Sequence, residues 1–304
     1  MFAFVWFILW AYAILVSSSS TDQDNNNNNN NNGFYWQAQN IFILAGQSNM
    51  SGRGGVINET WDGVVPIQCQ PDSSILRLSA RLTWVEAQDP LHQDIDLNKT
   101  CGVGPGMAFA KSILNKDPNL GIIGLVPCAV GGTRLSEWGR GSVLYNQLLR
   151  RAEAAVQGGG GGRIRAMLWY QGESDTVTKE EAELYKLRLK RFFTHIRDDL
   201  HLPALPIIQV ALASGEGPNI NIETVREAQL GLELPNVKCI DAKGLGLEAD
   251  NLHLTTSAQV QLGQMFADAF LQSSSILHNI QSSAAPSSLQ NFVFHSFFRW
   301  VLFG

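Results

Sequence analysis

Metal-ligand spacings are missing from this sequence. Its four cysteines form no CxxC pair, and its six histidines form no pair with the spacing of metal ligands. Structural zinc sites use closely spaced Cys and His, so the sequence predicts no metal site. The glycine run 158–162 lacks a following GK[ST] and precedes a strand pattern, which predicts a flexible connector rather than a phosphate loop. We therefore expect neither a metal nor a cofactor.

An excess of positive charge is also missing. The chain carries 22 Lys and Arg against 27 Asp and Glu, a net charge of -5 at pH 7. Nucleic acids and anionic membranes attract basic faces, so we expect neither as a partner. The hydrophobic fraction of 45% and the charged fraction of 16% are typical of a soluble globular protein, in one domain or at most two.

The amino-terminal end is apolar over residues 2–16 and then small and polar, which is short for a transmembrane helix. This pattern indicates a secretory signal peptide over residues 1–17. The segment has no positive residue besides the amino terminus, so an uncleaved membrane anchor is the alternative. We expect a secreted protein of the extracellular space or cell wall.

Composition divides the rest of the chain into three parts. Residues 18–36 are rich in Ser and Asn and have no apolar surface to bury, which predicts a disordered linker. Residues 37–272 carry the alternating pattern of a folded domain. Residues 273–304 are rich in Ser and then aromatic. Their role stays open between a lipid-anchor signal, an interfacial segment and an unusual tail, and we do not expect membrane association.

In a secreted protein, the asparagines of Asn-X-Ser/Thr sequons can be glycosylated. Asn58 and Asn98 each begin one, and both are candidate glycosylation sites. Asn49 also fits the pattern, but a glycan would block the motif that surrounds it. We expect Asn49 to be unmodified.

An even number of cysteines in a secreted chain permits disulfides. Cys69 and Cys101 lie in loop-like surroundings and are the candidate pair. Cys128 and Cys239 lie in strand-like runs, which predicts buried thiols.

Short apolar strands alternate with helical patterns between residues 37 and 272. Such continuous apolar strands predict an α/β fold with a mainly parallel sheet of about five strands and helices on both faces. In such sheets, ligand-binding and catalytic residues lie at the carboxyl ends of the strands. The expected strands are Ile41–Ala45, Ile122–Val126, Ala166–Tyr170, Ile207–Leu212 and Val237–Asp241.

Small polar clusters follow three of these strands. Ser48 follows the first strand and is either an exposed nucleophile or a turn or N-cap serine, since the surrounding sequence is not GxSxG. Gly131 and Gly132 follow the second strand, as oxyanion donors or as an ordinary turn. Gln171 follows the third, where its amide could face the same oxyanion.

The acidic residues after the third and the last strand allow two interpretations of the active site. Glu173 with a second acid, Asp250, would suit a glycosidase. Asp250 and His253 instead lie three residues apart before the last helical pattern, where a carboxylate and an imidazole can meet above the sheet. A hydroxyl nucleophile needs such a base, and the base needs a carboxylate to hold its tautomer.

Five ordered motifs, "FILAGQSNMSGRGG", "VGPGMAFA", "VPCAVGGT", "WYQGESD" and "DNLHLT", resemble the plant carbohydrate esterases of the SGNH hydrolase superfamily, which have a sialate O-acetylesterase or acetylxylan-esterase-like domain. The resemblance implies a three-layer α/β/α sandwich and a serine esterase without a metal. It implies Ser48 as nucleophile, His253 as base and Asp250 as its partner.

The resemblance also implies an oxyanion hole made by the Ser48 backbone N–H and by Gly131, with Gly132 as second choice and Gln171 as a side-chain donor. The implied substrate is an O-acetylated carbohydrate, such as a cell-wall polysaccharide. The alternatives are a general lipase or esterase of the same superfamily and a non-catalytic carbohydrate-binding protein.

Overall fold

The computed structural model describes residues 38–157, 162–217 and 221–283, with side chains up to residue 273. The expected signal peptide, the linker and the aromatic end of the tail lie outside these ranges. Among the residues that the structure describes, no helix combines the length and the apolar composition needed to cross a membrane.

A seven-stranded sheet with the order β5-β4-β6-β1-β7-β8-β9 forms the centre of the protein. All neighbouring strands are parallel except β4 and β5. The strands of this sheet are β1 Asn40–Gly46, β4 Ile75–Leu78, β5 Trp84–Glu86, β6 Ile123–Pro127, β7 Arg163–Tyr170, β8 Ile207–Ala211 and β9 Val237–Asp241; a separate hairpin pairs β2 Val56–Ile57 with β3 Thr60–Trp61.

The five expected strands are present, and β4 and β5 are additional. Their signals are weak because β4 has only four residues, including the charged Arg77, and β5 has three. Arg77 is tolerated inside because its guanidinium donates to Asp94 and to the Leu91 carbonyl. The expected class, an α/β fold with a mainly parallel sheet, is confirmed, with two more strands at one edge.

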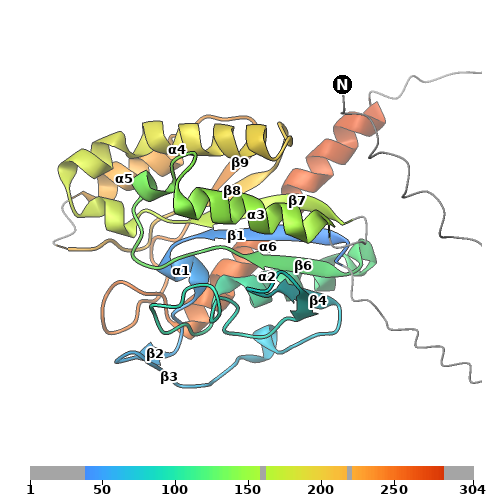
Figure 1. Cartoon of the computed structure of the whole chain (residues 1–304), viewed down its shortest axis with the longest axis horizontal. Helices are drawn as coiled ribbons and strands as arrows, with labels where there is room; N and C mark the ends of the chain where they lie inside the picture. The colour runs from blue at the N-terminus through green and yellow to red at the C-terminus, as the bar shows by residue number, and fades with distance from the viewer. Residues whose placement is uncertain (1–37, 158–161, 218–220, 284–304) are drawn as a thin grey trace, which may run out of the picture. The chain divides into compact units, whose positions relative to one another are not determined.

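Amphipathic helices cover both faces of the sheet and complete three layers. Figure 1 shows α3, α4 and α5 on one face and α2 and α6 on the other, where α2 and α6 pack together. The helices are α1 Ser48–Ser51, α2 Pro105–Lys116, α3 Val143–Gln157, α4 Lys179–Asp199, α5 Ile222–Leu230 and α6 Thr256–Ser283, with 3-10 turns η1 Ile67–Cys69, η2 Pro118–Leu120, η3 Leu135–Trp138 and η4 Glu173–Thr176.

The last helix differs from the expectation at its carboxyl end. The sequence predicts that the folded domain ends at residue 272, but α6 continues to Ser283. Once a helix has formed, each further residue adds a backbone hydrogen bond, so a polar extension can follow an apolar segment.

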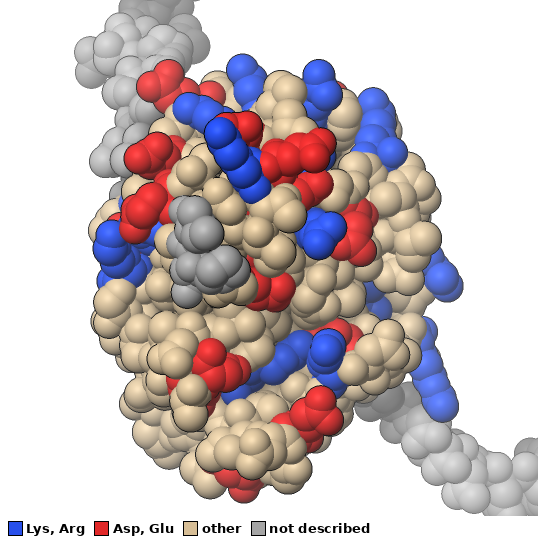
Figure 2. Space-filling view, turned by 90° about the vertical axis from the view of Figure 1, so that its left-hand side faces the viewer, with Lys and Arg blue, Asp and Glu red and all other residues tan. Residues whose placement is uncertain are grey.

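Strand β1 lies at the centre of the sheet, between β6 and β7. The chain moves from β1 to one side of the sheet and then crosses to the other, so β1 marks the switch point where open α/β sheets place their ligands. Figure 2 views the molecule from the side toward which the carboxyl ends of these strands point. Basic and acidic side chains are interspersed on this face rather than gathered in one patch.

Candidate active site

Ser48 is the first residue of the short helix α1, directly after β1. The turn before it requires glycine, because Gly46 has a φ of +132° and a Cβ there would lie 2.0 Å from the Tyr170 carbonyl oxygen. Gln47 is the N-cap residue, so Ser48 is not one. The Ser48 hydroxyl makes no hydrogen bond within the described part of the chain, although its residue is only 4% exposed. Ser48 is therefore buried rather than exposed as expected, and its hydroxyl is unpaired among the described residues.

Asp250 and His253 form a hydrogen-bonded pair after β9. The Asp250 Oδ2 atom lies 2.6 Å from His253 Nδ1, while Oδ1 accepts the backbone N–H groups of Leu252 and His253, both at 2.9 Å. Burial raises the pKa of Asp250, but these N–H groups and the ring outweigh it and leave the pKa below its ordinary value. Asp250 therefore stays ionised and directs Nε2 of His253 away from itself.

Asn49 connects the Ser48 turn to the His253 loop. Its side chain accepts the Leu254 N–H at 2.9 Å and donates to the Leu252 carbonyl at 3.3 Å, so it holds the backbone on both sides of His253. Its Nδ2 also donates to Glu173 Oε1 at 2.7 Å. Asn49 is fully buried, which leaves no room for a glycan at this sequon.

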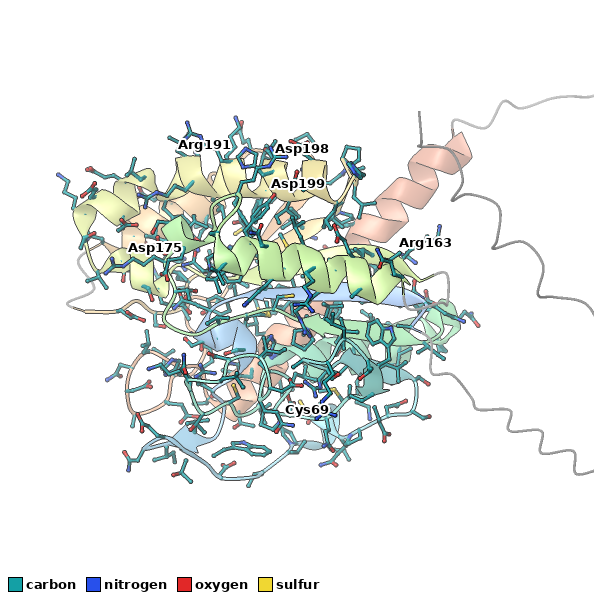
Figure 3. The ribbon with its side chains drawn as sticks, in the orientation of Figure 1. Cys69, Arg163, Asp175, Arg191, Asp198 and Asp199 are labelled. Carbon is teal, nitrogen blue, oxygen red and sulfur yellow. The ribbon has the colours of Figure 1, made fainter. Side chains whose placement is uncertain are left out.

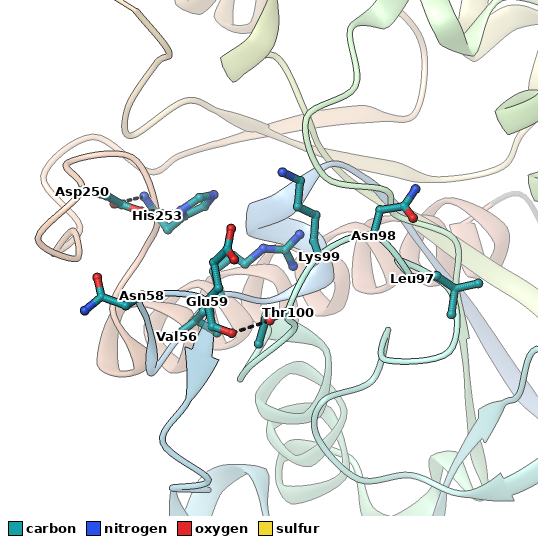
Figure 4. A pocket seen from close by; sticks show the side chains of 10 residues that line it. Val56, Asn58, Glu59, Leu97, Asn98, Lys99, Thr100, Asp250 and His253 are labelled. Atoms are coloured by element: carbon teal, nitrogen blue, oxygen red, sulfur yellow. Dashed lines mark hydrogen bonds and ion pairs between the residues drawn. The ribbon is translucent and has the colours of Figure 1, made fainter.

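A pocket of about 460 Å³ opens beside the Asp250–His253 pair. Figure 4 shows Asp250 and His253 at one end of it and Leu97 and Asn98 at the other, with Glu59 and Lys99 between them. The pocket wall is rich in amide, hydroxyl and charged groups, which can bond to sugar hydroxyls. Both sequon asparagines, Asn58 and Asn98, belong to this wall.

Two of the expected oxyanion donors are already occupied. The Gly131 N–H donates to Asp96 Oδ2 at 3.0 Å. The Gln171 amide is fully buried and donates to Asp175 at 2.6 Å and to the Thr133 carbonyl at 3.0 Å. The expectation of free donors at Gly131 and Gln171 is therefore wrong. The Gly132 N–H has no acceptor within the described residues, and its φ is +72°.

Glu173 and Asp175 are interior residues rather than a solvent-facing carboxylate pair. Both are fully buried, and burial raises the pKa of each to about 7. Asp175 accepts the Leu135 N–H through both oxygens, at 3.1 and 3.0 Å. Figure 3 shows Asp175 near the end of the sheet at which the parallel strands finish. Arg163, the first residue of β7, lies at the other end. Because the Glu173 carboxyl is enclosed, a glycosidase site built on Glu173 and Asp250 does not fit.

All four cysteines are free thiols, so the expected Cys69–Cys101 disulfide is wrong. The two thiols of the expected pair lie beside different charged residues. Cys69 contacts Asp89, and Cys101 lies 3.5 Å from Arg53 Nη1. Burial raises the pKa of Cys101 to about 11, which keeps this thiol protonated and unreactive. Loop-like sequence surroundings did not indicate that these side chains turn inward.

The sequence reasoning missed Asn49, Arg53 and Asp96 as supports of the site. Asn49 and Arg53 lie within the first motif, so that motif was the available signal. Asp96 lies in a polar loop with no signal of its own. Across residues 38–157, 162–217 and 221–283, no three His, Cys, Asp or Glu side chains gather as metal ligands.

Comparison with known proteins identifies the family. A family model described as carbohydrate esterase, sialic acid-specific acetylesterase, matches residues 38–272. A probable carbohydrate esterase of Arabidopsis thaliana is 57% identical over 238 residues, which cover 76% of this chain and 90% of the relative.

Solved structures agree with this match. The crystal structure of an Arabidopsis thaliana protein has a TM-score of 0.74 at 55% identity, covering 77% of this chain and 98% of that chain. NanS has a TM-score of 0.65 at 18% identity, covering 78% and 97%. A carbohydrate acetylesterase from Xanthomonas citri has a TM-score of 0.53 at 20% identity, and the match covers 75% of this chain and 55% of that chain. The last two show a shared fold alone.

The resemblance seen in the five motifs is thus confirmed, and the matched region spans most of the chain. The chain belongs to the carbohydrate esterase family described as sialic acid-specific acetylesterases, and it is a carboxylic ester hydrolase.

Proposed function

We propose that the protein removes O-acetyl groups from carbohydrate with Ser48 as nucleophile, His253 as general base and Asp250 as the carboxylate that holds the base. The observation that carries this proposal is the 2.6 Å contact between Asp250 Oδ2 and His253 Nδ1, on a loop that Asn49 ties to the Ser48 turn. A free serine hydroxyl at a sheet switch point and an oriented imidazole are the two parts that acyl transfer requires.

The reaction proceeds in two halves. The Ser48 oxygen attacks the acetyl carbonyl carbon while its proton passes to His253 Nε2, and the carbonyl oxygen becomes an oxyanion. The N–H groups of Ser48 and Gly132 are the proposed oxyanion donors, because the structure gives neither of them an acceptor among the described residues. His253 then protonates the leaving sugar oxygen, and acetyl-Ser48 remains.

Water completes the cycle. It gives a proton to His253 as it attacks the acetyl-Ser48 carbonyl. His253 returns this proton to the Ser48 oxygen as the second tetrahedral intermediate collapses, which releases acetate and restores the Ser48 hydroxyl. Asp250 stays ionised throughout and stabilises the imidazolium that forms in each half, which agrees with its lowered pKa.

The pocket and the relatives support the proposed substrate class. The pocket wall offers Glu59, Lys99 and Thr100 as hydrogen-bonding groups, and the relative from Arabidopsis thaliana is named a probable carbohydrate esterase. We take an acetylated sugar, such as a cell-wall polysaccharide unit, as the substrate. A general esterase would instead prefer octanoate over acetate esters, and a non-catalytic binding protein would bind acetylated xylan without releasing acetate.

Ser48→Ala tests the mechanism on 4-nitrophenyl acetate and on acetylated xylan. We expect turnover to fall by about 10³-fold or more, because the nucleophile is lost while its buried surroundings stay in place. Ser136→Ala is the matched control, since Ser136 is an exposed residue of η3 far along the chain. Equal activity of Ser48→Ala and the wild type would remove the proposal.

We extend the proposal to the location of the protein, which we take to be secreted with glycans at Asn58 or Asn98. Its support is the apolar amino-terminal segment and the exposure of both asparagines. Expression of the full chain in plant cells tests it: the protein should accumulate in the medium and lose mass on treatment with an N-glycosidase. Retention inside the cells with no mass change would contradict it.

A further inference from the structure

A buried ion pair lies beneath the pocket, next to the proposed nucleophile. Arg53 and Asp96 are 5% and 2% exposed, and Arg53 Nη2 lies 2.5 Å from Asp96 Oδ2. Arg53 follows α1 by two residues, whereas Asp96 belongs to the loop between β5 and α2. Neither residue is part of the proposed triad.

One oxygen of Asp96 joins two segments that carry the proposed chemistry. Its Oδ2 atom accepts the Ser51 hydroxyl at 2.9 Å, from the end of α1, and the Gly131 N–H at 3.0 Å, from the loop after β6. Arg53 strengthens the first connection, because its Nη1 donates to Ser51 Oγ at 2.7 Å and to the Gly52 carbonyl at 2.9 Å. The pair thus connects the nucleophile helix to the glycine loop.

The approach of these segments is close enough to exclude a side chain at position 131. A Cβ on Gly131 would lie 2.5 Å from Arg53 Nη2 and 3.4 Å from Ser48 Cβ. Gly131 therefore packs against both the ion pair and the proposed nucleophile. Asp96 takes the Gly131 N–H, whereas the N–H of the following residue, Gly132, has no acceptor among the described residues.

We propose that Asp96 and Arg53 are positioning residues that hold the glycine loop against the Ser48 helix and so set the geometry of the oxyanion hole. This inference rests on the proposed function. A buried ion pair is costly to desolvate, and replacing it with apolar groups is often neutral for stability, so stability alone is a weak reason for its presence here. Misplacing an oxyanion donor by about 1 Å, in contrast, costs roughly 100-fold in rate.

Asp96→Asn tests the inference, with Asp94→Asn as the matched control. Asp94 lies two residues earlier in the same loop and also pairs with a buried arginine, Arg77, but that pair is at β4, next to the edge strand β5. We expect Asp96→Asn to lower kcat roughly 10- to 100-fold with KM within about 2-fold, because the oxyanion forms only after the substrate binds. Asp94→Asn should change kcat by about 2-fold or less.

Affinity for phenylboronic acid separates positioning from general damage. This probe forms a tetrahedral adduct on an active serine, so its affinity should fall in parallel with kcat/KM in Asp96→Asn and stay unchanged in Asp94→Asn. If Asp96→Asn and Asp94→Asn have the same kcat and the same boronate affinity, the inference is wrong.

Arg53→Lys covers the case in which Asp96→Asn fails to fold. It keeps the positive charge beside Asp96 but loses the fork that also reaches Ser51 and Gly52, and we expect kcat to fall roughly 10-fold. Wild-type kcat in folded Arg53→Lys would then overturn the inference. The Ser48→Ala result separates this failure from that of the proposed function: loss of activity there, with normal kcat in Asp96→Asn and Arg53→Lys, defeats the positioning role alone.

Discussion

The loops after β7 and β9 both carry acidic residues at the carboxyl edge of the sheet, yet they use them in opposite ways. Glu173 and Asp175 after β7 are fully buried, and burial raises the pKa of each to about 7. Asp250 after β9 has a side chain that is 49% exposed and a pKa below its ordinary value. The first loop supports the site from within, whereas the second faces the pocket and can take part in proton transfer.

The largest effect that would test this contrast is expected from Asp250→Asn. An amide that keeps its oxygen on the Leu252 and His253 N–H groups presents its NH₂ to His253 Nδ1, which then must accept a hydrogen bond. The ring proton moves to Nε2, so His253 cannot take the Ser48 proton. We expect kcat to fall about 10²- to 10⁴-fold, measured as acetate release at saturating substrate, with the urea midpoint nearly unchanged.

Asp241→Asn is a useful control for Asp250→Asn, because Asp241 also carries a lowered pKa but pairs with Arg226 at the end of β9. It should retain most of the kcat. If Asp250→Asn kept wild-type kcat, the β9 loop would have no catalytic role and the contrast between the two loops would disappear.

A smaller effect, on stability, is expected in the β7 loop. Glu173→Ala removes the acceptor of the Asn49 Nδ2 proton and leaves a cavity in a fully buried place. We expect the free energy of unfolding to fall by about 2 kcal/mol, measured by urea denaturation. Glu173→Gln keeps the size and the acceptor oxygen, so it should lose about 1 kcal/mol or less and retain turnover. Loss of turnover in folded Glu173→Gln would show that this carboxyl does chemistry.

The smallest expected effect is a dependence of stability on pH. Burial raises the pKa of Glu173 from 4.5 to about 7, so the folded protein keeps a proton that the unfolded chain releases. This contribution to stability is fully present below about pH 4.5 and is lost as pH rises through about 7. Between pH 6 and pH 7, the unfolding free energy should therefore fall by about 1 kcal/mol more in the wild type than in Glu173→Gln.

Comparison with Glu173→Gln is needed because other buried groups titrate in the same range. Burial raises the pKa of Asp89 and of Asp175 to about 7, and both groups remain in the variant. Equal pH dependence in the two proteins would mean that Glu173 is ionised in the folded state.

The sequence predicted the parts of the fold that depend on long apolar patterns. Strand β7 and helix α4 are examples, since their buried residues recur at the spacing of a strand and of a helix. Strand β4 was missed because it is short and contains Arg77, whose burial depends on Asp94, a distant partner.

In the candidate site too, contacts between residues close in sequence could be predicted, whereas contacts between distant residues could not. Asp250 and His253 are close in sequence, so their meeting could be expected, and they are hydrogen-bonded in the structure. The occupancy of the Gln171 amide depends on Asp175 and on a carbonyl from another loop, and the fate of the Gly131 N–H depends on Asp96. Such long-range pairings leave no local pattern, which is why the oxyanion donors were misjudged.

The central position of β1 also affects how the enzyme loses activity on heating. Strand β1 has hydrogen-bonded neighbours on both sides and is entirely buried, so its amides can exchange with solvent only when the whole sheet opens. The segment around His253 has partly exposed residues and can open by itself. The proposed nucleophile thus directly follows one of the last segments to unfold, and the proposed base lies on one of the first, so heat should inactivate the enzyme reversibly before it melts.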